Sequence, residues 1–133
     1  MNPADFSQFV EITPSAPVLA TVHGWRAKCL QRLIRMDLPV PRSRAIPASV
    51  VRAIAAGRSL PEAELGRLIA EGGGLMGVRP SAMDPEWGGP STILNIGLND
   101  ACHRQLTERL GAEAADALYR GFVQSYAIHV ARL

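Results

Sequence analysis

Apolar residues recur at helical spacing along most of this 133-residue chain. The clearest case is residues 18–36, where apolar positions lie three or four residues apart, as they do on one face of a helix. Similar spacing predicts four further helices, and Gly111 separates the last two. The five expected helices cover residues 18–36, 47–56, 61–71, 99–110 and 112–133.

Capping signals support the starts of three of these helices. Pro47 lies at a first helical position, where its missing N–H does no harm. Ser59 and Glu62 have the spacing of a capping box. Asn99 or Asp100 is expected to cap the fourth helix through its side-chain oxygen.

Strand signals are few. Residues 42–46 and 75–79 are expected to form short strands, and residues 92–98 a short helix. Residues 1–17 contain three prolines and few periodic apolar positions, so we expect an irregular arm with a short helix around residues 5–10.

These elements predict an α+β fold that is predominantly helical, with about five helices and a very small sheet. Residues 18–133 are expected to form a single domain after the arm. Because strands are so sparse, a doubly wound parallel sheet is excluded.

The charge balance indicates no polyanionic partner. The chain has 14 Lys and Arg against 12 Asp and Glu, and the basic residues are scattered among acidic ones. Without a basic run, neither nucleic acid nor a membrane surface is expected to bind. No apolar stretch reaches the ~20 residues of a membrane span, and residues 1–14 lack the pattern of a secretory signal. We therefore expect a cytoplasmic protein.

The two cysteines, Cys29 and Cys102, lie outside any metal-binding spacing. We expect both to be small buried side chains in a reducing compartment. His23, His103 and His129 are not spaced as metal ligands either. The sequence nominates no metal site and no catalytic residues.

The second half of the chain carries a motif of distinctive order. Val78 and Arg79 precede a loop with Gly88, the run TILNIGLND follows at residues 92–100, and YRGFVQ follows at residues 119–124. This order resembles the N-terminal ATP-grasp domain (the PEP/pyruvate-binding, nucleotide-binding domain) of pyruvate phosphate dikinase. There a strand ending in Val-Arg-Ser-Gly-Ala precedes a glycine-containing loop and an Asp-Thr-Ile-Leu-Asn-Leu-Gly-Leu-Asn run.

A second, less specific match lies nearer the N-terminus. The sequence GWRA at residues 24–27 leads through a helix to LPVP at residues 38–41. The family has Gly-Gly-Lys-Gly, a helix and then Gly-Leu-Pro-Val-Pro. The resemblance thus runs from Gly24 to the C-terminus and implies a partial N-terminal lobe of an ATP-grasp fold.

The resemblance implies a nucleotide site. Arg79 and Arg26 match the family's Arg and Lys on the ATP phosphates, and Gly88 and Thr92 belong to the loop that lies over them. A glycine-rich turn at a helix start offers N–H groups to phosphate oxygens. The implied ligand is ATP or another phosphorylated small molecule. Without such a ligand, Arg26 is a solvated side chain at a helix start.

Several positions depart from the family pattern. Trp25 and Ala27 replace glycines, which hinders close backbone approach to a phosphate. Pro80 and Ser81 replace Ser-Gly, and Pro80 removes a backbone donor beside Arg79.

The family's magnesium-binding carboxylates and its other domains have no counterpart in this chain. Phosphoryl transfer depends on metal-assisted charge neutralisation. We therefore expect a nucleotide-binding half-domain that is incomplete for phosphoryl transfer alone, with magnesium bound only if a second protein chain supplies ligands. Whether it forms part of an enzyme stays open. The alternative is a non-catalytic interaction or regulatory module, for example a homodimer, that retains the fold without the ligand.

Three features allow two interpretations each. Arg79 either clamps a phosphate or pairs with Asp84 or Glu86. Trp87, in the long loop of residues 83–91, either stacks on an adenine or anchors its own loop. The last helix has one apolar face, which is either core or a contact surface for a partner. This face comprises Ala115, Leu118, Tyr119, Phe122, Tyr126 and Val130.

Overall fold

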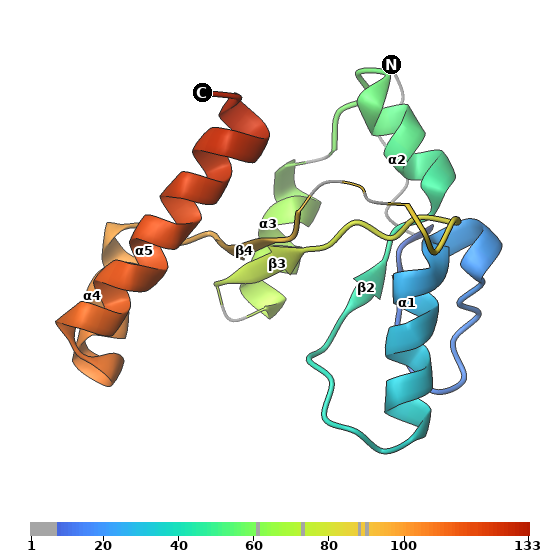
Figure 1. The fold of residues 1–133 in the computed structure, drawn as a ribbon, viewed down its shortest axis with the longest axis horizontal. Coiled ribbons are helices and arrows are strands. Elements are labelled where there is room, and N and C mark those ends of the chain that lie inside the picture. Colours follow the sequence, from blue (N-terminus) through green and yellow to red (C-terminus); the bar gives the residue numbers. More distant parts are fainter. Residues whose placement is uncertain (1–7, 61, 73, 88, 90) are drawn as a thin grey trace. The chain divides into compact units, whose positions relative to one another are not determined.

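The computed structural model describes residues 8–133 apart from residues 61, 73, 88 and 90. The chain divides into two compact units (Figure 1). The first contains Met1–Leu65 and Ser81–Gly89, and the second contains Gly66–Pro80 and Pro90–Leu133.

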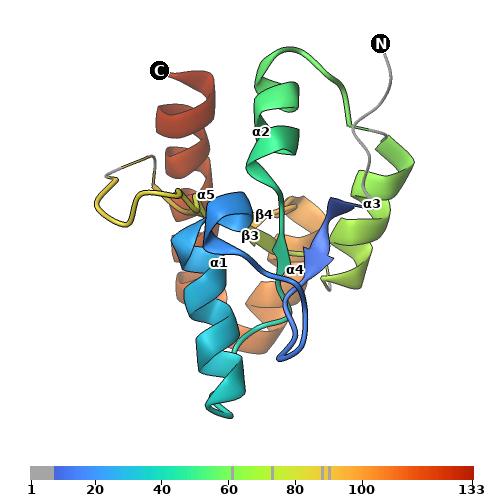
Figure 2. The same ribbon diagram turned by 90° about the vertical axis from the view of Figure 1, so that its right-hand side faces the viewer.

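Two short strands and two helices organise the first unit. Helix α1 (Ala20–Arg35) leads to strand β2 (Arg44–Ala45) and helix α2 (Ala48–Ala55). Strand β2 pairs antiparallel with β1 (Val10–Glu11), with Val10 opposite Ala45 (Figure 2). Apolar side chains from α1, the strands and the adjoining loops form the core. They are Ile12, Val18, Ala27 and Ala45, with Val10, Ala16, Leu30 and Ile34 packed against them.

A buried glutamine ties the N-terminal segment to α1. The Gln31 side chain is fully buried, and its Nε2 donates to the carbonyls of Thr13 at 3.0 Å and Ala16 at 2.7 Å. Lys28 Nζ donates to Gln31 Oε1 and to the Val18 carbonyl, both at 2.9 Å. The Thr13 and Ala16 carbonyls also accept a backbone N–H within the segment, from Ala16 at 3.3 Å and from Val18 at 2.8 Å, so the Gln31 amide adds a second donor to each.

The second unit consists of a small hairpin and a helical hairpin. Strands β3 and β4 pair antiparallel, with Met76 opposite Ile96 and Val78 opposite Ile93. Its best buried apolar residues are Leu68, Leu98 and Ala115. The elements in order are α3 (Glu62–Glu71, which begins in the first unit), β3 (Met76–Val78), β4 (Ile93–Ile96), α4 (Asp100–Leu110), α5 (Ala112–Tyr126) and the π-helix η2 (Ala127–Ala131).

The predicted fold class is confirmed. Within the described parts of the chain, five α-helices accompany two two-stranded sheets. The cap of the fourth helix is Asn99, whose Oδ1 accepts the N–H of Cys102 at 2.9 Å. Gly111 separates α4 from α5 with a φ of 88°, a conformation that favours glycine.

The prediction of a short helix at residues 92–98 is wrong, because Ile93–Ile96 form strand β4. Pairing with β3 decides the conformation of this apolar run, which local periodicity leaves ambiguous. Asn95 and Gly97 both have positive φ, at 59° and 101°, which an α-helix does not allow. A Cβ on Gly97 would overlap the Gly74 carbonyl oxygen, so the chain needs glycine there.

Three smaller predictions are corrected. The last helix is α-helical only to Tyr126 and continues as η2. Val10 lies in strand β1 rather than in the helix expected around residues 5–10, whose first three residues fall outside the described part. Cys29 is exposed and Cys102 is half-buried, so neither is the buried thiol expected.

Candidate phosphate-binding site

The turn at Gly24 interrupts helix α1. Gly24 has φ 82° and ψ 166°, and the helical backbone resumes at Trp25. A Cβ on Gly24 would overlap the backbone carbonyl of Ser81. Glycine is therefore required twice over, for its positive φ and for the close approach of another segment.

The segment that approaches this turn caps the resumed helix. Ser81 Oγ accepts the N–H of Ala27 at 3.1 Å and donates to the carbonyl of His23 at 2.7 Å. The N–H of Trp25 donates to the Ala82 carbonyl at 2.8 Å. The first N–H groups of a helix are the groups that bind phosphate at such a turn. Here two of them are bound by the chain itself.

His23 adds no positive charge beside the turn. Its side chain is buried, and burial lowers the pKa of the imidazole below its ordinary value. Its Nδ1 accepts the N–H of Leu19 at 3.2 Å, which fits a neutral ring. Lys28, the lysine that follows the turn on α1, already binds Val18 and Gln31, so the candidate phosphate cation on this helix is Arg26.

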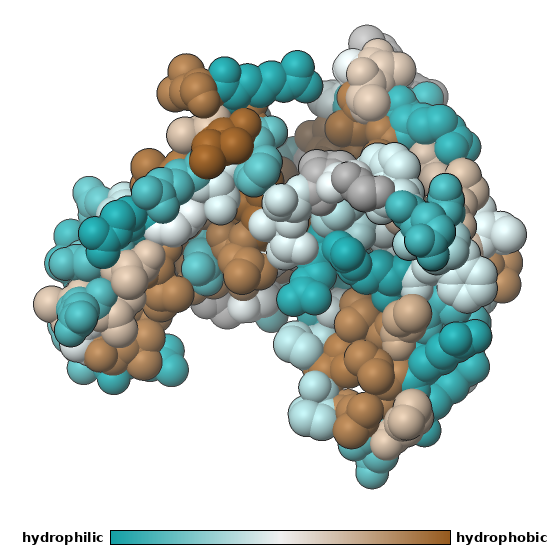
Figure 3. All heavy atoms as spheres, viewed as in Figure 1, coloured by the Kyte–Doolittle hydropathy of each residue, from teal (hydrophilic) through white to brown (hydrophobic). Residues whose placement is uncertain are grey.

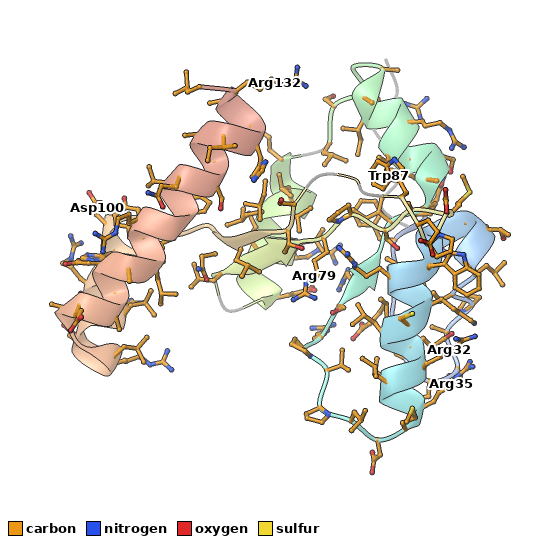
Figure 4. All side chains as sticks on the ribbon, in the orientation of Figure 1. Arg32, Arg35, Arg79, Trp87, Asp100 and Arg132 are labelled. Carbon is orange, nitrogen blue, oxygen red and sulfur yellow. The ribbon has the colours of Figure 1, made fainter. Side chains whose placement is uncertain are left out.

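The four residues assigned to the phosphate site fall into different parts of the chain. Arg26 is exposed in the first unit, whereas Arg79 and Thr92 belong to the second unit. Gly88 lies outside the described residues. Arg79 (labelled in Figure 4) directly follows β3. Thr92 directly precedes β4, so the antiparallel pairing of Val78 with Ile93 sets the two residues at the same end of the two strands.

The Arg79 side chain is exposed and has no hydrogen bond or ion pair to a described residue of its own unit. Asp84 and Glu86, its alternative partners, belong to the first unit, where Asp84 Oδ1 accepts the N–H of Glu86 at 2.9 Å. Of the predicted set, Arg79 and Thr92 are thus the pair that the hairpin brings together.

Trp87 belongs to the loop that carries Ser81. Its side chain is 53% exposed, and its ring lies over Gly89, where a Cβ would overlap it. Its backbone N–H donates to the Asp84 carbonyl at 3.2 Å. These contacts agree with the interpretation that Trp87 anchors its own loop.

A second set of polar contacts, which the sequence reasoning missed, joins α4 to α5. His103 Nε2 lies 2.7 Å from Asp116 Oδ1, and the Tyr119 hydroxyl donates to Asp100 Oδ1 at 2.9 Å. The bond to the Asp100 carboxylate raises the pKa of Tyr119 above its ordinary value. Helices α4 and α5 are joined at Gly111, and both pairs are centred in sequence between Arg109 and Leu110. Such symmetric spacing about the end of α4 is the signal that could have found both pairs.

These side chains border an open groove of about 450 Å³ between α4 and α5. The groove is lined by His103, Asp116, Tyr119, Arg120, Val123 and Gln124. Among the described residues no cluster of three or more His, Cys, Asp or Glu side chains is placed to hold a metal ion.

No protein-family model, curated protein or solved structure matches the chain. Among the described helices, none is both long and apolar enough to cross a membrane.

Proposed function

We propose that this chain is a non-catalytic interaction module that retains part of the pyruvate phosphate dikinase nucleotide-binding fold and has lost the phosphate ligand at the Gly24 turn. One observation carries the proposal. The N–H groups of Trp25 and Ala27, at the start of the resumed helix, are bound by Ala82 and Ser81 of the same unit. A phosphate at this turn has to displace both bonds.

The substitutions at the turn support the same function. Trp25 and Ala27 add side chains where the family has glycine, and the Arg32 guanidinium lies 6.0 Å from the Trp25 ring centroid. Cation–π contacts of this kind hold an arginine over a ring rather than free for a phosphate. We place the module in the cytoplasm, where the free thiols of Cys29 and Cys102 stay reduced.

The proposal is tested by titrating the protein with ATP, with and without magnesium, and monitoring the amide NMR signals of Trp25, Arg26 and Ala27. We expect no saturable shift at ATP concentrations up to about 1 mM, which corresponds to roughly 4 kcal/mol of binding free energy. Ser81→Gly restores the family residue and releases the Ala27 N–H, so any phosphate affinity of the turn should rise in this variant. Saturable shifts of these three amides in the unmodified chain would contradict the proposal.

A second candidate function is retained binding of ATP or another phosphorylated ligand at the hairpin end. The observation in its favour is that Arg79 and Thr92 lie at the same end of β3 and β4, with the Arg79 side chain exposed. Such a half-site needs a second chain to supply the magnesium ligands. It predicts ATP binding that Arg79→Ala abolishes and that Arg26→Ala leaves intact.

A further inference from the structure

The apolar face of α5 is covered at its start and open at its end. Ala115 is fully buried, Tyr119 and Phe122 are half-buried, Tyr126 is 51% exposed and Leu133 is 94% exposed. Val123, Ile128 and Val130 are also at least half exposed. In Figure 3 hydrophobic residues are visible along this helix between hydrophilic ones.

Charge is divided along the same helix. The acidic residues Glu113 and Asp116 lie in its first five residues, and no Asp or Glu follows Asp116 in the sequence. The basic residues Arg120, His129 and Arg132 lie in the remainder, and Arg132 follows the end of η2 (Figure 4). A parallel copy of this helix would set like charges side by side, and an antiparallel copy sets opposite charges side by side.

One antiparallel register sets both acidic residues opposite basic residues of a second copy, and Asp116 keeps its bond to His103 of its own chain. If Glu113 lies opposite Arg132 of a second copy, Asp116 lies opposite His129, and the centre of the pair falls between Phe122 and Val123. Val123 at this centre lines the open groove together with Asp116, Tyr119, Arg120 and Gln124, which recur at helical spacing on one side of α5.

We infer that α5 and η2 form an antiparallel homodimer contact, with Val123 near the two-fold axis. Three observations support this inference: the exposed apolar residues at the end of α5 and in η2, the separation of acidic from basic residues along the helix, and the position of the groove. The inference rests on the proposed function and names the partner as a second copy of this chain. The contact is isologous, since each copy contributes the same surface.

The test measures the mass of the full chain by light scattering after size exclusion, at concentrations up to about 1 mM, where even a weak interface is populated. We expect twice the mass of one chain, and the mass of a single chain for Val123→Glu. Val78→Glu is the matched control, because Val78 is also a valine of the second unit and both side chains are 53% exposed. It should remain dimeric.

Charge reversal tests the register. Glu113→Arg alone and Arg132→Glu alone should each weaken association at least tenfold. The double variant should restore it to within threefold of the original. A parallel contact predicts no such rescue. Circular dichroism of every variant separates loss of association from loss of folding.

A monomeric unmodified chain, a dimeric Val123→Glu variant, a monomeric but folded Val78→Glu variant or an absent rescue each overturns the homodimer. None of these results bears on phosphate binding at the Gly24 turn. Conversely, ATP binding there overturns the proposed function whatever the mass of the chain.

Discussion

The two units use polar side chains in opposite ways. In the first unit Gln31 and Ser81 point inward and bind backbone groups of distant segments. In the second unit Tyr119 and His103 bind carboxylates across the exposed side of a helical hairpin. A turn whose backbone N–H groups are already hydrogen-bonded has few donors left to bind a ligand. A helical hairpin with an exposed apolar end can still bind a partner.

The comparison can be measured unit by unit. Both tryptophans, Trp25 and Trp87, belong to the first unit, and both tyrosines, Tyr119 and Tyr126, belong to the second. Tryptophan fluorescence therefore reports unfolding of the first unit, and tyrosine absorbance reports the second.

The largest effect is expected at the Gly24 turn. Gly24→Ala forces a Cβ into the Ser81 backbone at positive φ, and we expect a loss of roughly 4 kcal/mol in the free energy of unfolding of the first unit. Gly57→Ala is the matched control, with φ 90° and open space around its Cβ, and should cost about 1 kcal/mol. Urea unfolding followed by tryptophan fluorescence measures both. Equal losses would mean that the Ser81 segment does not pack on the turn.

A smaller loss is expected at the buried glutamine. Gln31→Leu removes a buried amide that donates to the carbonyls of Thr13 and Ala16 and accepts from Lys28, while each carbonyl keeps one backbone donor. We expect a loss of roughly 2 kcal/mol in the free energy of unfolding of the first unit. Gln8→Leu changes an exposed glutamine of the same unit and should alter the free energy of unfolding by no more than about 0.5 kcal/mol. The same fluorescence measurement compares the two. If Gln31→Leu behaves like the control, the buried bonds do not stabilise the unit.

The helices were predictable because their signals are local. The Asn99 side chain caps the start of α4, as its residue type predicts. Gly111 ends α4 at the position where the helical spacing of apolar residues is interrupted. Strand β4 was missed because its conformation depends on β3, a segment elsewhere in the chain.

The candidate site shows the same division. The resemblance nominated the Gly24 turn and Arg79 as phosphate contacts, which stays a prediction. The capping of Ala27 by Ser81 spans 54 residues, and no local pattern encodes it. Ser81, whose hydroxyl fills the turn, stands where the resemblance implies glycine, so the departure was visible in the sequence while the hydrogen bonds of Ser81 were not.

Acid should weaken the first unit through His23. His23 is buried and its pKa lies below the ordinary value, so the unfolded chain binds a proton at a higher pH than the folded chain does. Stability of the first unit should therefore fall as the pH drops through the ordinary histidine pKa of about 6.5 and level off below the lowered one. The carboxyl of Glu11, whose pKa Arg42 lowers, contributes only at more acidic pH.

Urea midpoints from tryptophan fluorescence at about pH 7.5 and pH 5.5 measure this dependence. His23→Asn keeps an acceptor for the Leu19 N–H and removes the titrating ring, so its midpoint should change less between the two pH values. The exposed His129 provides the control, because His129→Asn should leave the dependence unchanged. If the urea midpoint of His23→Asn changes with pH as much as that of the unmodified chain, groups other than His23 cause the pH dependence.

The smallest effect is expected at the surface of the second unit, where it concerns a pKa rather than folding. Tyr126→Phe leaves Tyr119 as the single tyrosine, and its phenol should titrate above the ordinary value of about 10 because the Asp100 carboxylate accepts its hydrogen bond. Adding Asp100→Asn removes the negative charge and should return the titration to that value. Phenolate absorbance measures both. Identical titration curves would show that the Tyr119 bond does not persist in solution. Of the contacts described between α4 and α5, the His103–Asp116 bond and the packing of the His103 ring on the Tyr119 ring would then remain.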